Sequence, residues 1–305
     1  MPAIGNLLVA AAIIGFFVLA CVGSATRKDV TTGFDEPAHA SYVAHIQQTG
    51  DAWPDLKRLR LLDPHTFEFT GEPNYLNHPP LFYALLAAIG PKLEGRPQAL
   101  LAYRLFDVAL VAAGLAALLA LGLTAPFSRT EFYAYAMPLL WIPILVQLAA
   151  TVNNDDPAFF GGALATLGVW QLVATGRGLW LACALIGMVA ASWAKLTGLL
   201  LTATMVSAAL TYLQWRGRMR WSWIAAAGVA FVLAAAPYVT SGSMAVRRRK
   251  YRRRSRYLRT ARAPRVGPTC RAKLFPSISR RSSLPSSPTG CRSWVRAPYS
   301  ITPCS

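Results

Sequence analysis

Long apolar runs separated by short polar segments fill the first 240 residues of the chain. The first run covers about Ile4 to Val22. After a polar stretch, further apolar runs follow at about 79–91, 100–123, 132–151, 157–174, 178–194, 196–213 and 221–239. A helix needs about 20 mostly apolar residues to cross the hydrocarbon layer of a membrane. The pattern therefore predicts an all-α, polytopic membrane protein with a helical bundle.

The run 79–91 decides the topology of everything that follows it. As a helix it spans only about 20 Å, too short for a crossing. If it lies in the membrane interface and the N-terminus is cytoplasmic, Arg129, Arg177 and the arginines of 216–220 all fall in cytoplasmic loops, as the positive-inside tendency requires. If the run 79–91 crossed the membrane instead, the arginines of 216–220 would lie outside. We therefore expect an interfacial helix at 79–91, about seven transmembrane helices and a large first outer loop at 23–78.

Composition agrees with this prediction: hydrophobic residues make up 54% of the chain and charged residues only 14%. A soluble domain carries about one quarter charged residues. The formal net charge of +18 is typical of a nucleic-acid binder, but the basic residues are not spread evenly along the chain. Of the 31 Lys and Arg, 17 follow residue 240, whereas all 13 Asp and Glu precede it. The basic excess belongs to 241–305, and we expect no nucleic-acid partner.

The segment 241–305 is rich in Arg, Ser and Pro and has no apolar periodicity. One interpretation is a solvated basic arm that binds anionic lipid or nucleic acid. The other is a change of reading frame near 241–246, because out-of-frame translation of GC-rich DNA gives Arg, Pro and Ser in excess and few acids. Seven crossings from an inside start leave the segment outside, so we favour the frameshift. Both interpretations predict a disordered basic tail.

Asp35 and Glu36 are the first candidates for chemistry, in the run Phe34-Asp35-Glu36-Pro37-Ala38-His39. Adjacent carboxylates shift each other's pKa, and one can serve as a general base or a metal ligand. The structural alternative is a helix start, with Asp35 as the cap and Pro37 in the first turn. Together with His39, the two acids are also the residues that would hold a divalent metal. The five cysteines show no metal-ligand spacing.

Five more polar residues lie at the ends of apolar runs, on the same side of the predicted topology. His78 precedes two prolines that restrict its backbone, although these prolines also suit the start of an interfacial helix. Asn154 and Asp155 belong to a polar turn of a kind that is common between helices. Arg104 and Lys195 either extend to the lipid headgroups or meet a phosphate.

Five motifs resemble, in order, those of the GT-C membrane glycosyltransferases, with protein O-mannosyltransferases and lipid A aminoarabinose transferases nearest in pattern. They are FDEPAHASYVAHIQQTGDAWP, NHPPLFYALLA, ALLAYRLFDVALVAAG, TVNNDDPAFFGGALA and SWAKLTGLLL. The resemblance covers about residues 1–240. It implies transfer of a sugar from a polyprenyl-phosphate carrier to a protein, lipid or polysaccharide hydroxyl at the outer (periplasmic or extracellular) face of the cell membrane. No cofactor is required.

The resemblance also implies roles for individual residues. Asp35 would be the general base of an inverting transfer, and Glu36 and His39 would shape the site. Three basic residues would neutralise the leaving lipid phosphate, namely His78, Arg104 and Lys195. Asn154 and Asp155 would border the sugar or carrier pocket. Family members continue with further helices where this chain has its basic tail.

Two other functional classes stay open. A transporter or flippase-like carrier also uses intramembrane charges and short re-entrant helices. The chain shows no internal repeat, however, and its acidic first loop suits an enzyme of the outer face better. A non-catalytic fragment is the third alternative.

Overall fold

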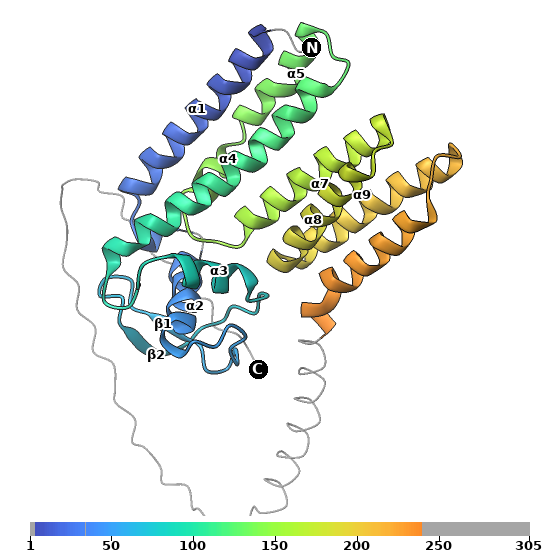
Figure 1. The fold of residues 1–305 in the computed structure, drawn as a ribbon. Helices are drawn as coiled ribbons and strands as arrows, with labels where there is room; N and C mark the ends of the chain where they lie inside the picture. Colours follow the sequence, from blue (N-terminus) through green and yellow to red (C-terminus); the bar gives the residue numbers. More distant parts are fainter. Residues whose placement is uncertain (1–3, 34, 240–305) are drawn as a thin grey trace, which may run out of the picture. The chain divides into compact units, whose positions relative to one another are not determined.

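The computed structural model describes residues 4–33 and 35–239 (Figure 1). The structure is 74% helical and has almost no strand, which confirms the predicted all-α class. The segment 241–305 lies outside the described residues. Its expected disorder and the suggested change of reading frame therefore stay predictions.

The helices are α1 (Ile4–Arg27), α2 (Glu36–Thr49), α3 (Leu81–Ile89), α4 (Leu100–Thr124), α5 (Arg129–Leu140), α6 (Pro143–Ala149), α7 (Asp155–Thr175), α8 (Gly178–Ala194) and α9 (Leu196–Trp215). A further helix covers Trp221–Val239. Two short strands, β1 (Arg60–Leu62) and β2 (Phe69–Pro73), pair antiparallel.

Five of the described helices are long and apolar enough to cross a membrane, which identifies a multi-pass membrane protein. They are α1, α4 with the turn before it, α7, α9 and Trp221–Val239. Helix α8 is apolar but has only 17 residues, the lower limit of spanning length. Helices α5 and α6 together pass as one bent span. All seven predicted crossings thus correspond to helical segments.

The predicted single helix over 132–151 is wrong, because the chain bends by 54° between α5 and α6. Pro138 lies inside α5, and Pro143 begins α6 after the break. Proline lacks the backbone N–H that a continuous helix needs, and its ring clashes with the preceding turn. Two prolines five residues apart therefore break this segment.

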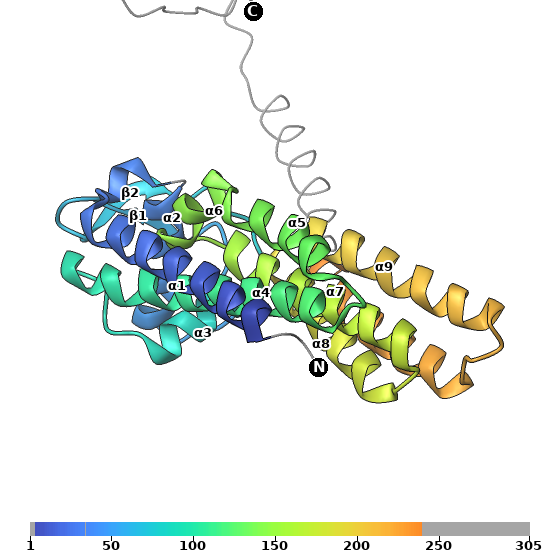
Figure 2. The ribbon, with the colours of Figure 1, turned by 90° about the horizontal axis from the view of Figure 1, so that it is seen from above.

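The helices of the bundle pack in two hydrophobic clusters. One cluster joins α1, α4, α5 and α6 around Phe17, Leu115 and Phe132. The other joins α7, α8, α9 and the last helix around Leu172 and Met188. Helix α4 contacts both α1 and α7 and so connects the two clusters. In Figures 1 and 2, α1 and α9 accordingly lie on opposite sides of the bundle.

Helices α7 and α8 approach each other unusually closely. A Cβ atom on Gly161 would lie 2.4 Å from the backbone nitrogen of Ala191, and one on Gly168 would lie 2.5 Å from that of Ala184. Small residues allow helix backbones in membranes to meet in this way. The glycines therefore set the distance between these two helices.

The chain between α1 and α4 is a folded unit rather than an open loop. We call it the outer subdomain (residues 28–99), after the first outer loop that the sequence predicts; it contains α2, the β1–β2 hairpin and α3. It has its own hydrophobic core, built around Val43, Leu59, Tyr83 and Leu93. Helix α3 has nine residues, too few to cross a membrane. Figure 1 shows this unit at one end of the bundle.

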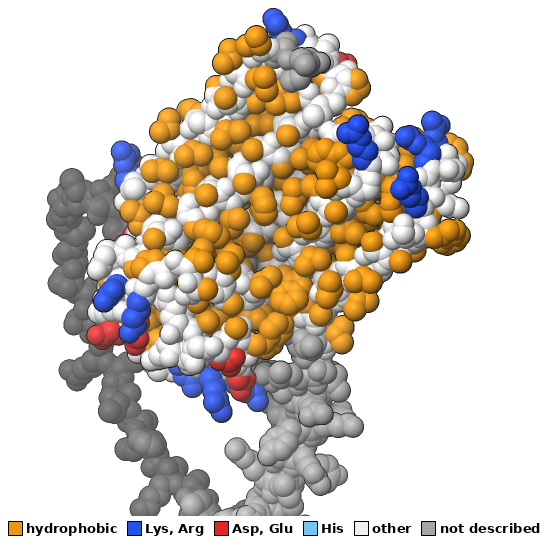
Figure 3. Space-filling model, viewed as in Figure 1, with side chains coloured by type: hydrophobic (Ala, Val, Ile, Leu, Met, Phe, Trp, Pro, Cys, Tyr) orange, Lys and Arg blue, Asp and Glu red, His pale blue; other side chains and the backbone are white. Residues whose placement is uncertain are grey.

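Lys and Arg side chains lie at both ends of the bundle, including the end opposite this unit (Figure 3). Arg129 at the start of α5 lies against Gly5 of α1, and Arg218 lies against Gly176 in the turn after α7. The loops that charge assigns to one side of the membrane therefore do lie at one end of the molecule.

Candidate active site

Asp35 stands at the first position before α2 and exposes its carboxylate. Its backbone is left-handed, with φ 52° and ψ 18°, a conformation that is uncommon outside glycine and is found at functional sites. The side chain does not cap α2. Instead, its Oδ1 accepts a hydrogen bond of 2.7 Å from the hydroxyl of Tyr75. Asp35 thus occupies the cap position and Pro37 lies in the first turn, as the structural alternative predicts. The carboxylate of Asp35, however, does not form the capping hydrogen bond.

Tyr75 comes from the segment after β2 and is itself 61% exposed. Burial, together with its hydrogen bond to Asp35, raises the pKa of Tyr75 to about 12. The phenol therefore stays protonated and donates to the carboxylate at neutral pH. It fixes the direction of the Asp35 side chain without neutralising its charge.

Glu36 points the other way, into the protein, and is fully buried. Arg104 of α4 binds it in a bidentate ion pair, with Nε 2.8 Å from Oε1 and Nη2 2.6 Å from Oε2. Nη1 of Arg104 donates to the carbonyls of Ala25 and Lys28, both at 2.8 Å. Oε1 of Glu36 also accepts from the backbone N–H of Val152 at 3.0 Å. This pair therefore joins α1, α2, α4 and the turn before α7.

Gly33 makes room for this arrangement. A Cβ atom at that position would lie 2.8 Å from both Cβ and Oε2 of Glu36, closer than real side-chain carbons come to such atoms. The close approach thus requires glycine beside the buried carboxylate.

The rings of His39 in α2 and of His78, in the segment before α3, are parallel, and their centroids lie 6.0 Å apart. His39 is buried, and its Nδ1 lies 2.8 Å from the hydroxyl oxygen of Tyr83. Burial, and next the nearby His78, lower the pKa of His39 to about 3. Burial and then the charge of Lys195 lower the pKa of His78. Both imidazoles are therefore neutral at pH 7.

Lys195 is the extended residue between α8 and α9, where the two helices turn back on each other. Its Nζ lies 2.5 Å from Oδ1 of Asp155 at the start of α7, and both side chains are 38% exposed. Asn154 is buried and donates to the carbonyl of Ala194 at 2.9 Å. These contacts tie the start of α7 to the α8–α9 turn.

The site residues from separate parts of the chain lie within electrostatic reach of one another. The charges of Asp35, Asp155 and Lys195 all influence the pKa of both His39 and His78. The structure thus brings five of the eight predicted site residues into one neighbourhood, in which His39 is buried and the other four are at least partly exposed. Of the other three, Glu36 and Arg104 form a buried ion pair, and Asn154 donates a hydrogen bond to the carbonyl of Ala194.

The three side chains that could hold a divalent ion, those of Asp35, Glu36 and His39, do not converge. Glu36 is bound to Arg104, and His39 faces Tyr83. Among residues 4–33 and 35–239, no group of three or more His, Cys, Asp or Glu side chains is arranged to hold a metal ion.

Sequence reasoning missed two buried acids, Asp107 of α4 and Asp156 of α7. Neither carboxylate oxygen of Asp107 has a hydrogen bond of normal geometry among the described residues. Asp156 accepts from the side-chain amide of Asn153 at 3.2 Å. For Asp107, the available signal was a single acidic residue inside an apolar run, since such residues are costly in a membrane and usually have a function. Asp156 belongs to the same polar turn as Asp155, and only Asp155 was chosen from it.

A scan of family models, curated proteins and solved structures found no match to this chain.

Proposed function

We propose that the protein is a membrane glycosyltransferase that uses a polyprenyl-phosphate sugar and acts at the outer face of the cell membrane. The observation that supports this best is the exposed carboxylate of Asp35. Its backbone is strained, and its side chain accepts a hydrogen bond from Tyr75. It lies within electrostatic reach of the buried His39 and of the partly exposed His78 and Lys195. A carboxylate of this kind is suited to remove a proton from an incoming hydroxyl.

In the proposed reaction, Asp35 accepts the proton of an acceptor hydroxyl as the oxygen attacks the anomeric carbon of the sugar. The bond between that carbon and the phosphate oxygen breaks, and the lipid phosphate leaves with the electron pair. Attack from the opposite side inverts the configuration. Lys195 supplies positive charge for the departing phosphate, where such charge lowers the barrier most. For this it exchanges its contact with Asp155 for one with the phosphate.

Arg104 has a different role in this proposal from the one implied by the family resemblance. Four of its five N–H groups are engaged with Glu36 and with two backbone carbonyls, and its side chain is only 6% exposed. It therefore does not meet the lipid phosphate. We assign the Glu36–Arg104 pair to holding the first turn of α2, and with it Asp35, in place.

The direct test is transfer from radiolabelled polyprenyl-phosphate sugars to membrane acceptors by the purified full chain. Asp35→Asn keeps the size and most hydrogen bonds of the side chain but removes the base. We expect it to lower the rate by about 100- to 10,000-fold, the usual contribution of a general base. Glu72→Gln, at another exposed acid of the outer subdomain, should leave the rate unchanged. Transfer that survives Asp35→Asn would sink the proposal.

The buried acids Asp107 and Asp156 favour one second candidate, a cation-coupled transporter. Acidic side chains inside a bundle commonly mark ion or proton pathways, and these two are buried with no basic residue bound to either among the described residues. Solute uptake into proteoliposomes that is lost in Asp107→Asn but kept in Asp35→Asn would support the transporter. Loss of sugar transfer in Asp35→Asn supports the enzyme.

A further inference from the structure

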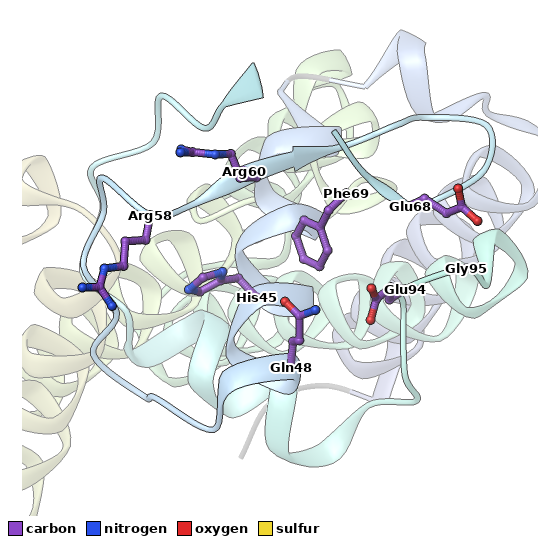
Figure 4. Close-up of a pocket in the computed structure, with 8 residues that line it drawn as sticks. All are labelled: His45, Gln48, Arg58, Arg60, Glu68, Phe69, Glu94 and Gly95. Carbon is purple, nitrogen blue, oxygen red and sulfur yellow. The ribbon is translucent and has the colours of Figure 1, made fainter. Parts of the chain in front are cut away.

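The outer subdomain has a hollow to which none of the predicted site residues contributes. It is a cavity of about 510 Å³. It is lined by the second half of α2, the two strands and the loop before α4 (Figure 4). The lining residues are His45, Gln48, Arg58, Arg60, Glu68, Phe69, Glu94 and Gly95.

The lining offers hydrogen-bond donors and acceptors around one aromatic ring. Figure 4 shows Phe69 near the centre, with His45 and Arg58 to one side of it and Glu94 to the other. The amide of Gln48 points into the same space and can both donate and accept. Burial lowers the pKa of His45. Its imidazole is therefore neutral at pH 7 and can also both donate and accept a hydrogen bond.

The charges of this lining argue against an anionic ligand. Two arginines are balanced by two glutamates, so a phosphate or polyanion would meet repulsion as well as attraction. The charged groups are also mostly exposed, and ion pairs of exposed groups contribute little. Directional hydrogen bonds and contact with the half-buried ring of Phe69 must therefore provide the affinity. Sugar hydroxyls both donate and accept at every position, and the carbon–hydrogen face of a sugar ring packs on aromatic rings.

We propose that this cavity binds a neutral saccharide chain, which is the acceptor of the transfer reaction. His45 lies ten residues beyond Asp35 along α2, a distance of about 15 Å for a helix. An acceptor of a few sugar units can therefore rest in the cavity while its terminal hydroxyl reaches the carboxylate. The identity of this ligand as the acceptor rests on the proposed function, whereas saccharide binding to the cavity does not.

The experiment measures binding of neutral linear tetrasaccharides to the full chain in lipid nanodiscs by isothermal titration calorimetry. The probes are the tetrasaccharides of mannose, glucose and N-acetylglucosamine. At least one should bind, and Gln48→Ala and Arg58→Ala should each weaken it about five- to tenfold, as expected for one lost hydrogen bond. Lys57→Ala and Glu72→Gln are matched controls, because both residues are exposed nearby but do not line the cavity.

Three results would overturn the inference: no binding of any tetrasaccharide, equal binding by cavity and control variants, or displacement of the sugar by a mixed-charge peptide or inorganic phosphate. Its failure is distinguishable from that of the proposed function. If Asp35→Asn abolishes transfer but no saccharide binds, the enzyme stands and the cavity proposal falls. If a saccharide binds in the cavity but no Asp35-dependent transfer is found, the site stands and its role as acceptor site falls.

Discussion

The roles of single side chains in this protein depend on partners that lie far away in the sequence. Glu36 and Arg104 are 68 positions apart, and each is a reasonable functional candidate when considered alone. In the structure they are both buried and satisfy each other. Burying one charge of such a pair without the other is expensive, because the remaining charge has lost its water.

Removing one member of this pair should therefore destabilise the protein strongly. We expect Arg104→Leu or Glu36→Leu to lower the free energy of unfolding by about 3–5 kcal/mol. The double variant should recover much of this loss, because no uncompensated charge stays buried. Thermal unfolding in detergent measures all three variants.

The exposed pair of Lys92 and Glu94, 3.4 Å apart, provides the matched control. Lys92→Leu should change stability by about 0–1 kcal/mol, as for other surface ion pairs. If Arg104→Leu were equally mild, the buried pair would not be the support that we assign to it.

Residue types indicated which positions are candidates for chemistry, but not how their side chains would point. Asp35, His78 and Lys195 were predicted as separate candidates, and in the structure the charges of Asp35 and Lys195 both reach His78. The hydrogen bond from Tyr75 to Asp35 was not predicted. It depends on the path of the chain after the hairpin, and no local pattern around Tyr75 records that path.

At the scale of elements, the α7–α8 contact offers a sharp comparison between two neighbouring glycines. Gly161 faces the backbone of α8, whereas a Cβ atom on Gly162 would meet nothing within 4 Å. We expect Gly161→Ala to destabilise the protein by about 1–3 kcal/mol through overpacking. Gly162→Ala should be neutral or slightly stabilising, because alanine favours a helix over glycine.

Thermal unfolding of the two variants under identical conditions checks this prediction. Equal melting temperatures would show that α7 and α8 do not approach each other as closely as described.

The elements themselves were predictable to different degrees. Apolar runs located the long helices within a few residues, because membrane-spanning length is a strong constraint. The break between α5 and α6 was missed, although Pro138 and Pro143 were visible, because the run as a whole had spanning length. Strands β1 and β2 were missed because they have only three and five residues. Such strands leave almost no periodicity in a polar segment.

For the whole molecule, the distribution of charge predicts the orientation in the membrane. The basic turns gather at one end of the bundle, and the outer subdomain lies at the other. Positive residues near helix ends favour the cytoplasmic side. We therefore expect Arg177 to face the cytoplasm and Glu72 to face outward.

Single cysteines at these two exposed positions test the orientation, in a chain whose five native cysteines are replaced by serine. A membrane-impermeant maleimide added to intact cells should label Glu72→Cys but not Arg177→Cys. The reverse result would overturn the orientation. Labelling of both would contradict the separation of the two ends.

The long sequence separation within the buried ion pair also affects how the protein is made. Chains are synthesised at about 5–20 residues per second, so the 68 residues between Glu36 and Arg104 take roughly 3–14 s to synthesise. During this time the new outer subdomain has an unpaired carboxylate that must stay in water. The backbone N–H of Val152, 116 residues after Glu36, arrives later still. The first turn of α2 thus reaches its final surroundings only after the ribosome has delivered the following helices, which makes assembly of the site a late event in biogenesis.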